Sequence, residues 1–154
     1  MPKEKSKELK LTIELVPETS WFKSLREHVG RENWDRIRKQ SYEDYGNKCG
    51  ICGDEGRLNC HEIWEYDDKK HIQKLIGFIA LCELCHHVKH IGLAKILAKQ
   101  GKLNYEEVEK HFMRVNGCDM LTLTDHRARA FEQWEERSEH DWKIDLGKYQ
   151  SMVK

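Results

Sequence analysis

Two Cys-x-x-Cys pairs carry the clearest chemistry in this sequence. The first pair is Cys49 and Cys52, and the second is Cys82 and Cys85. Four thiolates suit a tetrahedral zinc ion, and a site whose four positions are all filled by protein stabilises a fold without admitting water. The gap between the pairs is longer than in most zinc fingers, but a two-stranded hairpin requires it. The alternative, a thioredoxin-like redox pair, lacks its βαβ context. We therefore expect a structural zinc ion.

Histidines near the second pair predict a further, open site. His86 and His90 are four residues apart, which places both on one face of a helix. His61 lies between the two cysteine pairs in the sequence, and it would meet His86 and His90 if that helix packs across a hairpin. Two or three imidazoles leave room for water and a phosphate oxygen, which suits a divalent ion acting on a phosphodiester while a neighbouring base takes a proton from water. His87 is expected to be an ordinary surface residue.

The segment around these residues predicts a hairpin followed by a helix. Glycines on both sides of Cys49 indicate a tight knuckle. Residues 58–64 and 77–81 have the composition of two strands, and a helical pattern begins at Glu83. The apolar positions expected to be buried on that helix are Leu84, Val88, Ile91 and Ala94. This order of elements predicts an α+β fold with a small treble-clef core.

The N-terminal flank predicts a strand and then helix. Alternating apolar residues over 11–15 indicate a short strand that ends at Pro17. Ser20 is a candidate cap for a helix that continues after Gly30. The apolar residues near helical spacing are Trp21, Phe22, Leu25, Val29, Trp34, Ile37, Tyr42 and Tyr45.

The C-terminal flank is predicted to be helical. Asn104 precedes one apolar-periodic stretch, and Asn116-Gly117 indicates its end. Thr122 or Thr124 is the expected cap of a further helix. A final apolar patch consists of Trp142, Ile144 and Leu146. The chain thus divides into an N-terminal segment, 1–46, a metal-binding domain, 47–97, and a C-terminal helical segment, 98–154.

Charge and hydropathy limit the partners. The chain has 27 basic and 27 acidic residues, so affinity for a polyanion must come from local clusters. One such cluster is Arg31, Arg36, Arg38 and Lys39. The sequence shows no apolar leader and no apolar span, so we expect a cytoplasmic protein with no membrane contact and with reduced thiols. The stretch 82–86 also matches the attachment motif of c-type haem, but attachment needs export, so no haem is expected.

The central segment resembles a known family. Cys-x-x-Cys, a strand ending in a His-containing dyad, and Leu-Cys-x-x-Cys-His-x-x-x-His resemble the zinc-stabilised branch of the HNH endonucleases over about residues 47–97. Residues 16–21 and 134–138 also resemble bacterial and phage proteins of this kind. The resemblance implies the ββα-metal fold and metal-dependent cleavage of nucleic acid, with DNA as the expected substrate. In the family, the dyad supplies a metal ligand and then a general-base histidine, a hairpin asparagine steadies the loop, and the helix supplies another ligand.

The dyad admits two registers here, because it reads Cys60-His61-Glu62. In the first, which we prefer because imidazole titrates near neutral pH, His61 is the general base and Cys60 takes the ligand position. A thiolate there suits zinc or copper better than magnesium. In the second, His61 is a ligand beside His86 and His90, with Glu62 as the base or an oxygen ligand. The catalytic ion implied is Mg²⁺, Mn²⁺, Ni²⁺ or Zn²⁺, and His61 is essential in both registers.

The family asparagine is missing. Its position falls near Gly77, so Gln73, Asp67 or Asp68 would have to steady the hairpin. Cys60 and Cys118 remain as thiols in packing positions.

Two functions of different class follow from the sequence. The first is an HNH-like nuclease that hydrolyses DNA phosphodiesters with a structural zinc and a separate catalytic ion. The second is a non-catalytic zinc module that binds nucleic acid or a protein, such as a regulator or a phage-encoded inhibitor, and the departures at the dyad and asparagine positions favour it. One site per chain is compatible with a monomer or a dimer, and the terminal helices around Phe131 and Trp134 are the candidate face for self-association.

Overall fold

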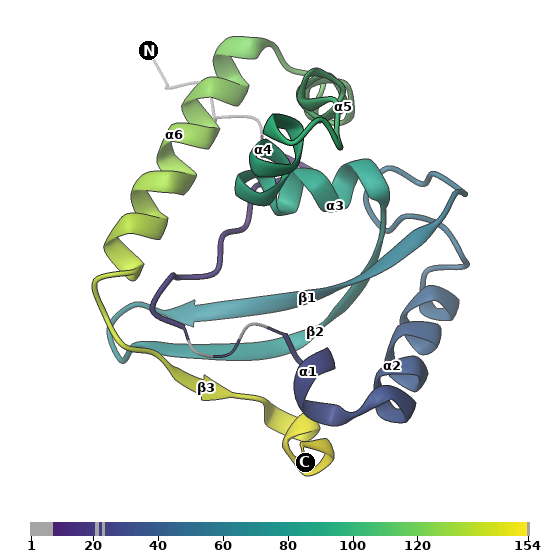
Figure 1. The fold of residues 1–154 in the computed structure, drawn as a ribbon, viewed down its shortest axis with the longest axis vertical. Coiled ribbons are helices and arrows are strands. Elements are labelled where there is room, and N and C mark those ends of the chain that lie inside the picture. Colours follow the sequence, from purple (N-terminus) through teal and green to yellow (C-terminus); the bar gives the residue numbers. More distant parts are fainter. Residues whose placement is uncertain (1–7, 21, 23, 154) are drawn as a thin grey trace.

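A hairpin with helices at both of its ends organises the molecule (Figure 1). The computed structural model describes residues 8–20, 22 and 24–153. Within them the fold is α+β, with a three-stranded sheet, six α-helices and one short 3-10 helix. The elements are α1 (Arg26–Val29), α2 (Arg31–Asp44), β1 (Leu58–Asp67), β2 (Ile72–Cys82), α3 (Glu83–Lys89), α4 (Ile91–Lys99), α5 (Tyr105–Asn116), α6 (Met120–Arg137), β3 (Lys143–Asp145) and η1 (Gly147–Met152).

The predicted hairpin is confirmed and is longer than expected. Strands β1 and β2 pair antiparallel from Leu58 opposite Cys82 to Asp67 opposite Ile72, with an irregularity between Ile63 and Trp64. At the turn, the Asp67 carboxylate accepts hydrogen bonds from the backbone N–H groups of Lys69 and Lys70 (3.0 and 2.9 Å). Asp68 also holds the turn, because both of its carboxylate oxygens accept hydrogen bonds from Arg137 (2.9 and 3.0 Å).

A third strand completes the sheet. Strand β3 pairs parallel with the start of β2, from Ile72 opposite Lys143 to Lys74 opposite Asp145. The predicted apolar patch lies here, since Trp142 and Leu146 are buried on either side of β3. The strand order is β1-β2-β3, so no strand among the described residues pairs with the outer edge of β1, which we call its free edge.

The strand predicted over residues 11–15 is wrong. These residues are extended but belong to no sheet, because their backbone groups bond to helices instead. The Leu11 N–H and C=O both pair with the Asn116 amide, and the Ile13 N–H donates to His126 Nε2 (2.9 Å). The Glu14 N–H donates to the Lys89 carbonyl (3.1 Å). We call residues 11–18 the N-terminal strap; Figure 1 shows it passing between α6 and α3.

The helix predicted from Ser20 is mostly absent. Among the described residues between Ser20 and Gly30 only the single turn α1 is helical, and the Ser20 hydroxyl donates to Gln73 Oε1 (2.7 Å) rather than capping a helix. Trp21 lies outside the described residues. After Gly30 the predicted helical pattern is confirmed as α2. The fully buried Gln73 thus ties the N-terminal residues to β2 and does not support the hairpin turn.

The helices after the hairpin follow the prediction with two changes. The helix expected from Glu83 breaks at His90, whose backbone leaves the helical range, and divides into α3 and α4. The Asn104 cap and the left-handed Gly117 at the end of α5 are confirmed. Helix α6 begins earlier than predicted, because the Asp119 carboxylate rather than a threonine caps it. None of the described helices is long and apolar enough to cross a membrane.

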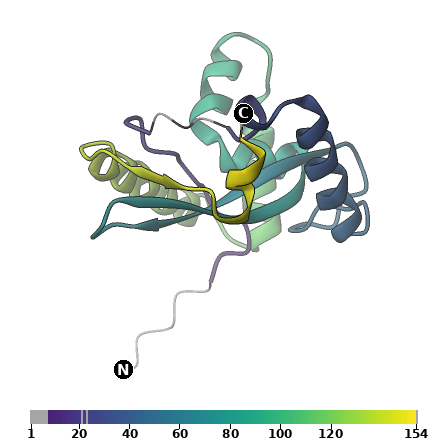
Figure 2. The same cartoon turned by 90° about the horizontal axis from the view of Figure 1, so that it is seen from below.

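Two apolar clusters lie on the two sides of the hairpin. The first contains residues from all three sequence segments, including Leu11, Leu81 and Phe112. The second includes Phe22 and Leu146 and packs beneath α1 and α2. In Figure 2, α6 lies at one end of the hairpin and α2 at the other. The flanking segments therefore share their core with the metal-binding segment.

Asn116→Ala tests how strongly the strap is fixed. The change leaves the N–H and C=O of buried Leu11 without partners, so we expect a loss of about 2–4 kcal/mol in the free energy of unfolding. Asn104→Ala removes only an exposed helix cap and should cost about 1 kcal/mol. Urea denaturation of the zinc-loaded protein, followed by circular dichroism, compares the two. A smaller loss of unfolding free energy in Asn116→Ala than in Asn104→Ala would contradict the role of Asn116 in fixing the strap.

Candidate metal centres

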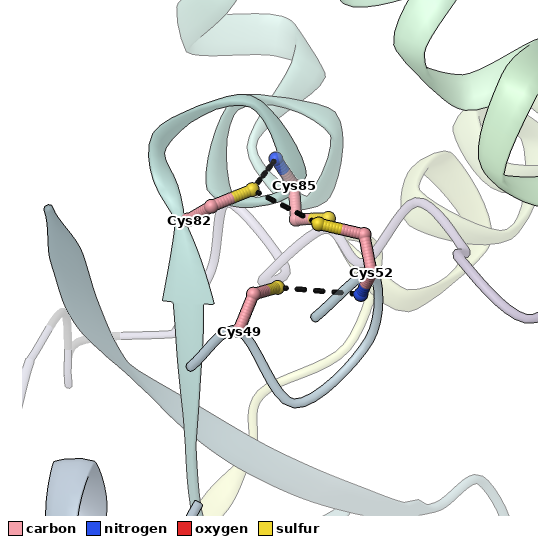
Figure 3. A group of neighbouring side chains, drawn as sticks. All are labelled: Cys49, Cys52, Cys82 and Cys85. Atoms are coloured by element: carbon pink, nitrogen blue, oxygen red, sulfur yellow. Dashed lines mark hydrogen bonds between the residues drawn. The ribbon is translucent and has the colours of Figure 1, made fainter. Parts of the chain in front are cut away.

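The four predicted cysteines meet at the point where the hairpin passes into α3 (Figure 3). Cys49 and Cys52 come from the loop before β1, Cys82 from the last residue of β2 and Cys85 from the first turn of α3. Their Sγ atoms all lie within 4.8 Å of one another, and those of Cys52 and Cys82 are 3.5 Å apart. Zinc–sulfur bonds of about 2.3 Å in a tetrahedron separate the sulfur atoms by about 3.8 Å. The cluster therefore fits a zinc ion.

Backbone geometry builds both cysteine knuckles. The Cys52 N–H donates to Cys49 Sγ and the Cys85 N–H donates to Cys82 Sγ (3.5 and 3.4 Å). Gly50 lies against β2, where an added Cβ would come within 2.8 Å of side-chain carbons of Ile79 and Tyr45. Only glycine allows this close approach, so the residue that follows Cys49 helps to set the position of the knuckle.

Crowding of the sulfur atoms perturbs their ionisation. Hydrogen bonds from Cys82 and Cys85 lower the pKa of Cys49. The pKa of Cys85 is raised by its contacts with Cys49 and then Cys82, and by burial. Several thiolates in this volume repel one another, and a divalent cation is the partner that would offset that repulsion.

His111 supports the cysteine cluster and was not found from the sequence. Its Nε2 lies 3.1 Å from Cys85 Sγ, and its Nδ1 lies 2.8 Å from Arg114 Nη2. Because a guanidinium can only donate, Nδ1 accepts and the proton is on Nε2, which donates to the sulfur. Burial, with the nearby charge of Arg114, lowers the pKa of His111. His111 lies on α5, far along the sequence from both Cys-x-x-Cys pairs, so no spacing pattern pointed to it.

A second cluster consists of His61, His86 and His90. One ring nitrogen of each lies within 4.8 Å of the others. His61 projects from β1, His86 from α3, and His90 from the break between α3 and α4. Burial and the neighbouring histidines lower the pKa of His86 to about 3 and of His90 to about 4. Neutral imidazoles are the form that binds metals, and an all-nitrogen set suits zinc or nickel better than magnesium.

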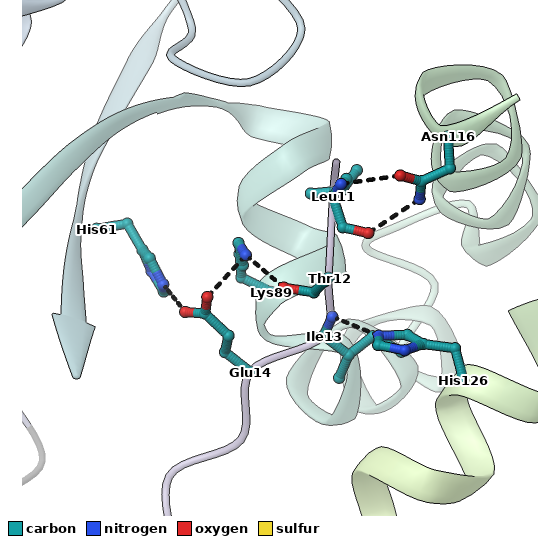
Figure 4. Close-up of polar contacts among 8 residues, drawn as sticks. All are labelled: Leu11, Thr12, Ile13, Glu14, His61, Lys89, Asn116 and His126. Carbon is teal, nitrogen blue, oxygen red and sulfur yellow. Dashed lines mark hydrogen bonds and ion pairs between the residues drawn. The ribbon is translucent and has the colours of Figure 1, made fainter. Parts of the chain in front are cut away.

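Glu14 joins this cluster from the N-terminal strap (Figure 4). Its carboxylate lies 2.9 Å from His61 Nε2 and 2.8 Å from Lys89 Nζ. Burial disfavours the charged carboxylate, but the hydrogen bond from His61 and the charge of Lys89 outweigh it and lower the pKa of Glu14 to about 2. Nothing in the local sequence pointed to Glu14, because its contacts with His61 and Lys89 depend on the course of the strap.

The neighbours of His61 face the other side of β1, as strand alternation requires. Cys60 packs with the second apolar cluster, and burial raises the pKa of its thiol to about 11. Glu62 Oε1 accepts from the Leu25 N–H (3.2 Å), Oε2 is buried without a partner, and burial raises the pKa of this carboxyl to about 7. The structure therefore does not bring Cys60 or Glu62 into the histidine cluster, and His87 also lies outside it.

Both faces of β1 border one large cleft. Its volume is about 1180 Å³, and its lining includes the three histidines, Glu14 and Glu62. Arginines from four parts of the chain line it: Arg26, Arg31, Arg38, Arg57 and Arg137. Arg38 and Arg137 are paired with Asp35 and Asp68, whereas the other three form no salt bridge within the described residues. Of the predicted basic cluster, Arg31 and Arg38 face this cleft, and Arg36 and Lys39 do not line it.

Comparison with known proteins gives no relative: no family model, no curated protein and no solved structure matches this chain. Function must therefore be inferred from the two clusters and the cleft.

The two clusters predict two kinds of metal binding. We expect one tightly held zinc ion, lost in Cys82→Ser, and a second, more weakly held divalent ion, lost in His90→Ala because one of three ligands is removed. Elemental analysis after dialysis measures the first, and calorimetric titration of the zinc-loaded protein with Ni²⁺ measures the second.

Two residues outside the clusters, a cysteine and a histidine, serve as matched controls. Cys118→Ser lies outside the sulfur cluster and should retain zinc, and His87→Ala removes an imidazole next to His86 and should retain nickel binding. Equal nickel affinity in His90→Ala and His87→Ala would show that the histidine cluster holds no ion.

Proposed function

We propose that this protein is a metal-dependent endonuclease of the HNH type that hydrolyses phosphodiester bonds of nucleic acid, with DNA as the expected substrate. The observation that carries the proposal is that three histidines lie together in a cleft lined with arginines. The order of knuckle, hairpin, second knuckle and helix agrees with the resemblance to that family. The closed sulfur cluster would be structural, and the open histidine cluster would hold the ion that takes part in the reaction.

His61, His86 and His90 are the residues that would hold the catalytic ion. When bound, such an ion polarises a phosphoryl oxygen and stabilises the charge that develops on it. This assignment adopts the second register of the dyad, with His61 as a ligand. It is supported by the position of His61 in the cluster and by the opposite orientation of Cys60.

Glu62 is then the proposed general base. It borders the same cleft from the other face of β1, beside the free edge of the strand. The Leu25 N–H holds Oε1, and Oε2 is buried and has no hydrogen-bond partner among the described residues, so the Glu62 side chain must turn toward the cleft before it can accept a proton from the attacking water.

The arginines would bind phosphates next to the scissile bond. Arg26, Arg31 and Arg57 line the cleft, and their forked guanidinium groups match phosphate oxygens. Clustering of this kind gives a neutral chain local affinity for a polyanion. Arg26 and Arg31 belong to the N-terminal segment, which would therefore contribute to substrate binding.

A second candidate function is a non-catalytic zinc module that binds nucleic acid or a protein partner. Two positions of the family pattern favour it. Cys60 does not face the histidines, and Gln73, the nearest amide to the missing asparagine, is bonded to Ser20. Such a protein would keep the sulfur cluster and the cleft without cleaving its ligand.

Cleavage of supercoiled plasmid separates the two functions. With Mg²⁺, Mn²⁺, Ni²⁺ or Zn²⁺ we expect nicked product from the native protein, and a rate at least about 100-fold lower in His61→Ala and Glu62→Gln. His87→Ala is the control and should cleave normally. Nicking that survives His61→Ala would contradict the mechanism, whereas binding without cleavage by the native protein would favour the non-catalytic module.

Arg31→Gln tests the proposed phosphate contacts. Fluorescence anisotropy of the zinc-loaded protein with labelled duplex, without any further divalent ion, should show weaker binding by the variant, and the slope of log affinity against log salt should fall by about 1. Arg36→Gln is the matched control, because Arg36 lies on the same helix outside the cleft and pairs with Glu32 (3.5 Å). The same loss of binding in both variants would contradict a specific role for the cleft.

A further inference from the structure

We infer that the N-terminal strap is part of the histidine site and that Glu14 is a positioning residue that fixes the tautomer and the orientation of His61. The inference rests on the metal site of the proposed function, but not on nuclease activity. It assigns a role to a segment that lies outside the predicted metal-binding domain. Figure 4 shows the contacts that carry it.

The hydrogen bond between Glu14 and His61 selects one tautomer. An ionised carboxylate can only accept, so His61 Nε2, 2.9 Å from Glu14 Oε2, carries the proton. The lone pair of a neutral His61 is then on Nδ1, the nitrogen left to coordinate an ion. A carboxylate behind a ligating histidine holds the ring in place and makes it a more basic ligand.

Lys89 holds Glu14 from the other side. Its side chain is only 6 % exposed, and its ammonium group donates to Glu14 Oε1 (2.8 Å) and to Thr12 Oγ1 (3.0 Å). Lys89 immediately precedes His90 on the chain. The Glu14 carboxylate thus links His61 on β1 to the end of α3, the helix that carries His86 and ends next to His90.

The C-terminal helices anchor the strap on both sides of Glu14. Before it, Asn116 on α5 clamps Leu11, and His126 on α6 accepts from the Ile13 N–H. After it, Trp134 Nε1 donates to the Val16 carbonyl (2.9 Å). Helices α5 and α6 supply no ligand to the histidine site, but through these contacts they hold the strap that carries Glu14.

Glu14→Gln tests the inference in the zinc-loaded protein. The substitution keeps the shape of the side chain and removes its charge, so we expect Ni²⁺ affinity at the histidine site to fall by about 10- to 100-fold. Glu18→Gln is the matched control: it makes the same change on a residue of the same strap that contacts neither His61 nor Lys89, and it should leave affinity unchanged. Thr12→Val removes the other partner of Lys89 and should also retain affinity. Unchanged affinity in Glu14→Gln, or equal losses in all three variants, would overturn the inference.

Nitrogen NMR of the zinc-loaded protein without nickel measures the tautomer of His61 directly, which a purely structural role of Glu14 would not change. We expect His61 to be protonated on Nε2 in the native protein and in Glu18→Gln, and to become a mixture of tautomers in Glu14→Gln. A native His61 protonated on Nδ1 would overturn the inference. If Glu14 has the expected effects but no plasmid is cleaved, the inference stands and the proposed nuclease function fails.

Discussion

The meeting of four cysteine sulfur atoms is the constraint on which the rest of the site depends. Two of them come from the loop before β1, and two come from the junction of β2 with α3. Joining them fixes where α3 begins relative to the hairpin. The same helix then places His86 over β1, where His61 projects, and the break at His90 turns the third imidazole inward. The position of the sulfur cluster thereby determines the geometry of the histidine cluster.

Residues with strong local signals were placed well from the sequence. The spacing of the cysteine pairs and of His86 and His90 depends only on local geometry, and so do the Asn104 cap and the Gly117 stop. Glu14 and His111 had no such signal, because each acts through one contact with a residue far away in sequence. The strap looked like a strand because its residues alternate, but its backbone partners are side chains of α5 and α6 and the Lys89 carbonyl of α3. Strand β3 was missed because three residues are too few for a pattern.

The choice between the two registers of the Cys60-His61-Glu62 dyad also went beyond what a local sequence pattern can show. A strand dipeptide predicts that its two side chains face opposite sides, but not which of them faces the helix. The structure places His61 toward α3 and Cys60 and Glu62 toward α1 and α2. The free edge of β1 allows one cleft to reach both faces. Glu62 therefore borders the cleft from the face of β1 opposite to the histidines.

The three sequence segments act as one unit around the cleft. The N-terminal segment contributes Glu14 and two arginines, the middle segment contributes both metal clusters, and the C-terminal helices hold the strap and supply His111. Their residues share one apolar cluster, so the position of the strap is coupled to the packing of α5 and α6. This arrangement gives the flanking helices a direct part in the chemistry proposed for the centre.

X-ray absorption spectroscopy of protein loaded with zinc and then with one equivalent of nickel tests the two-centre account most directly. The account predicts a zinc edge with a shell of four sulfur atoms at about 2.3 Å. It predicts a nickel edge with nitrogen and oxygen neighbours and the multiple scattering of imidazole rings, lost in His61→Ala. Sulfur around the nickel, or a nickel spectrum without imidazole that His61→Ala leaves unchanged, would contradict it.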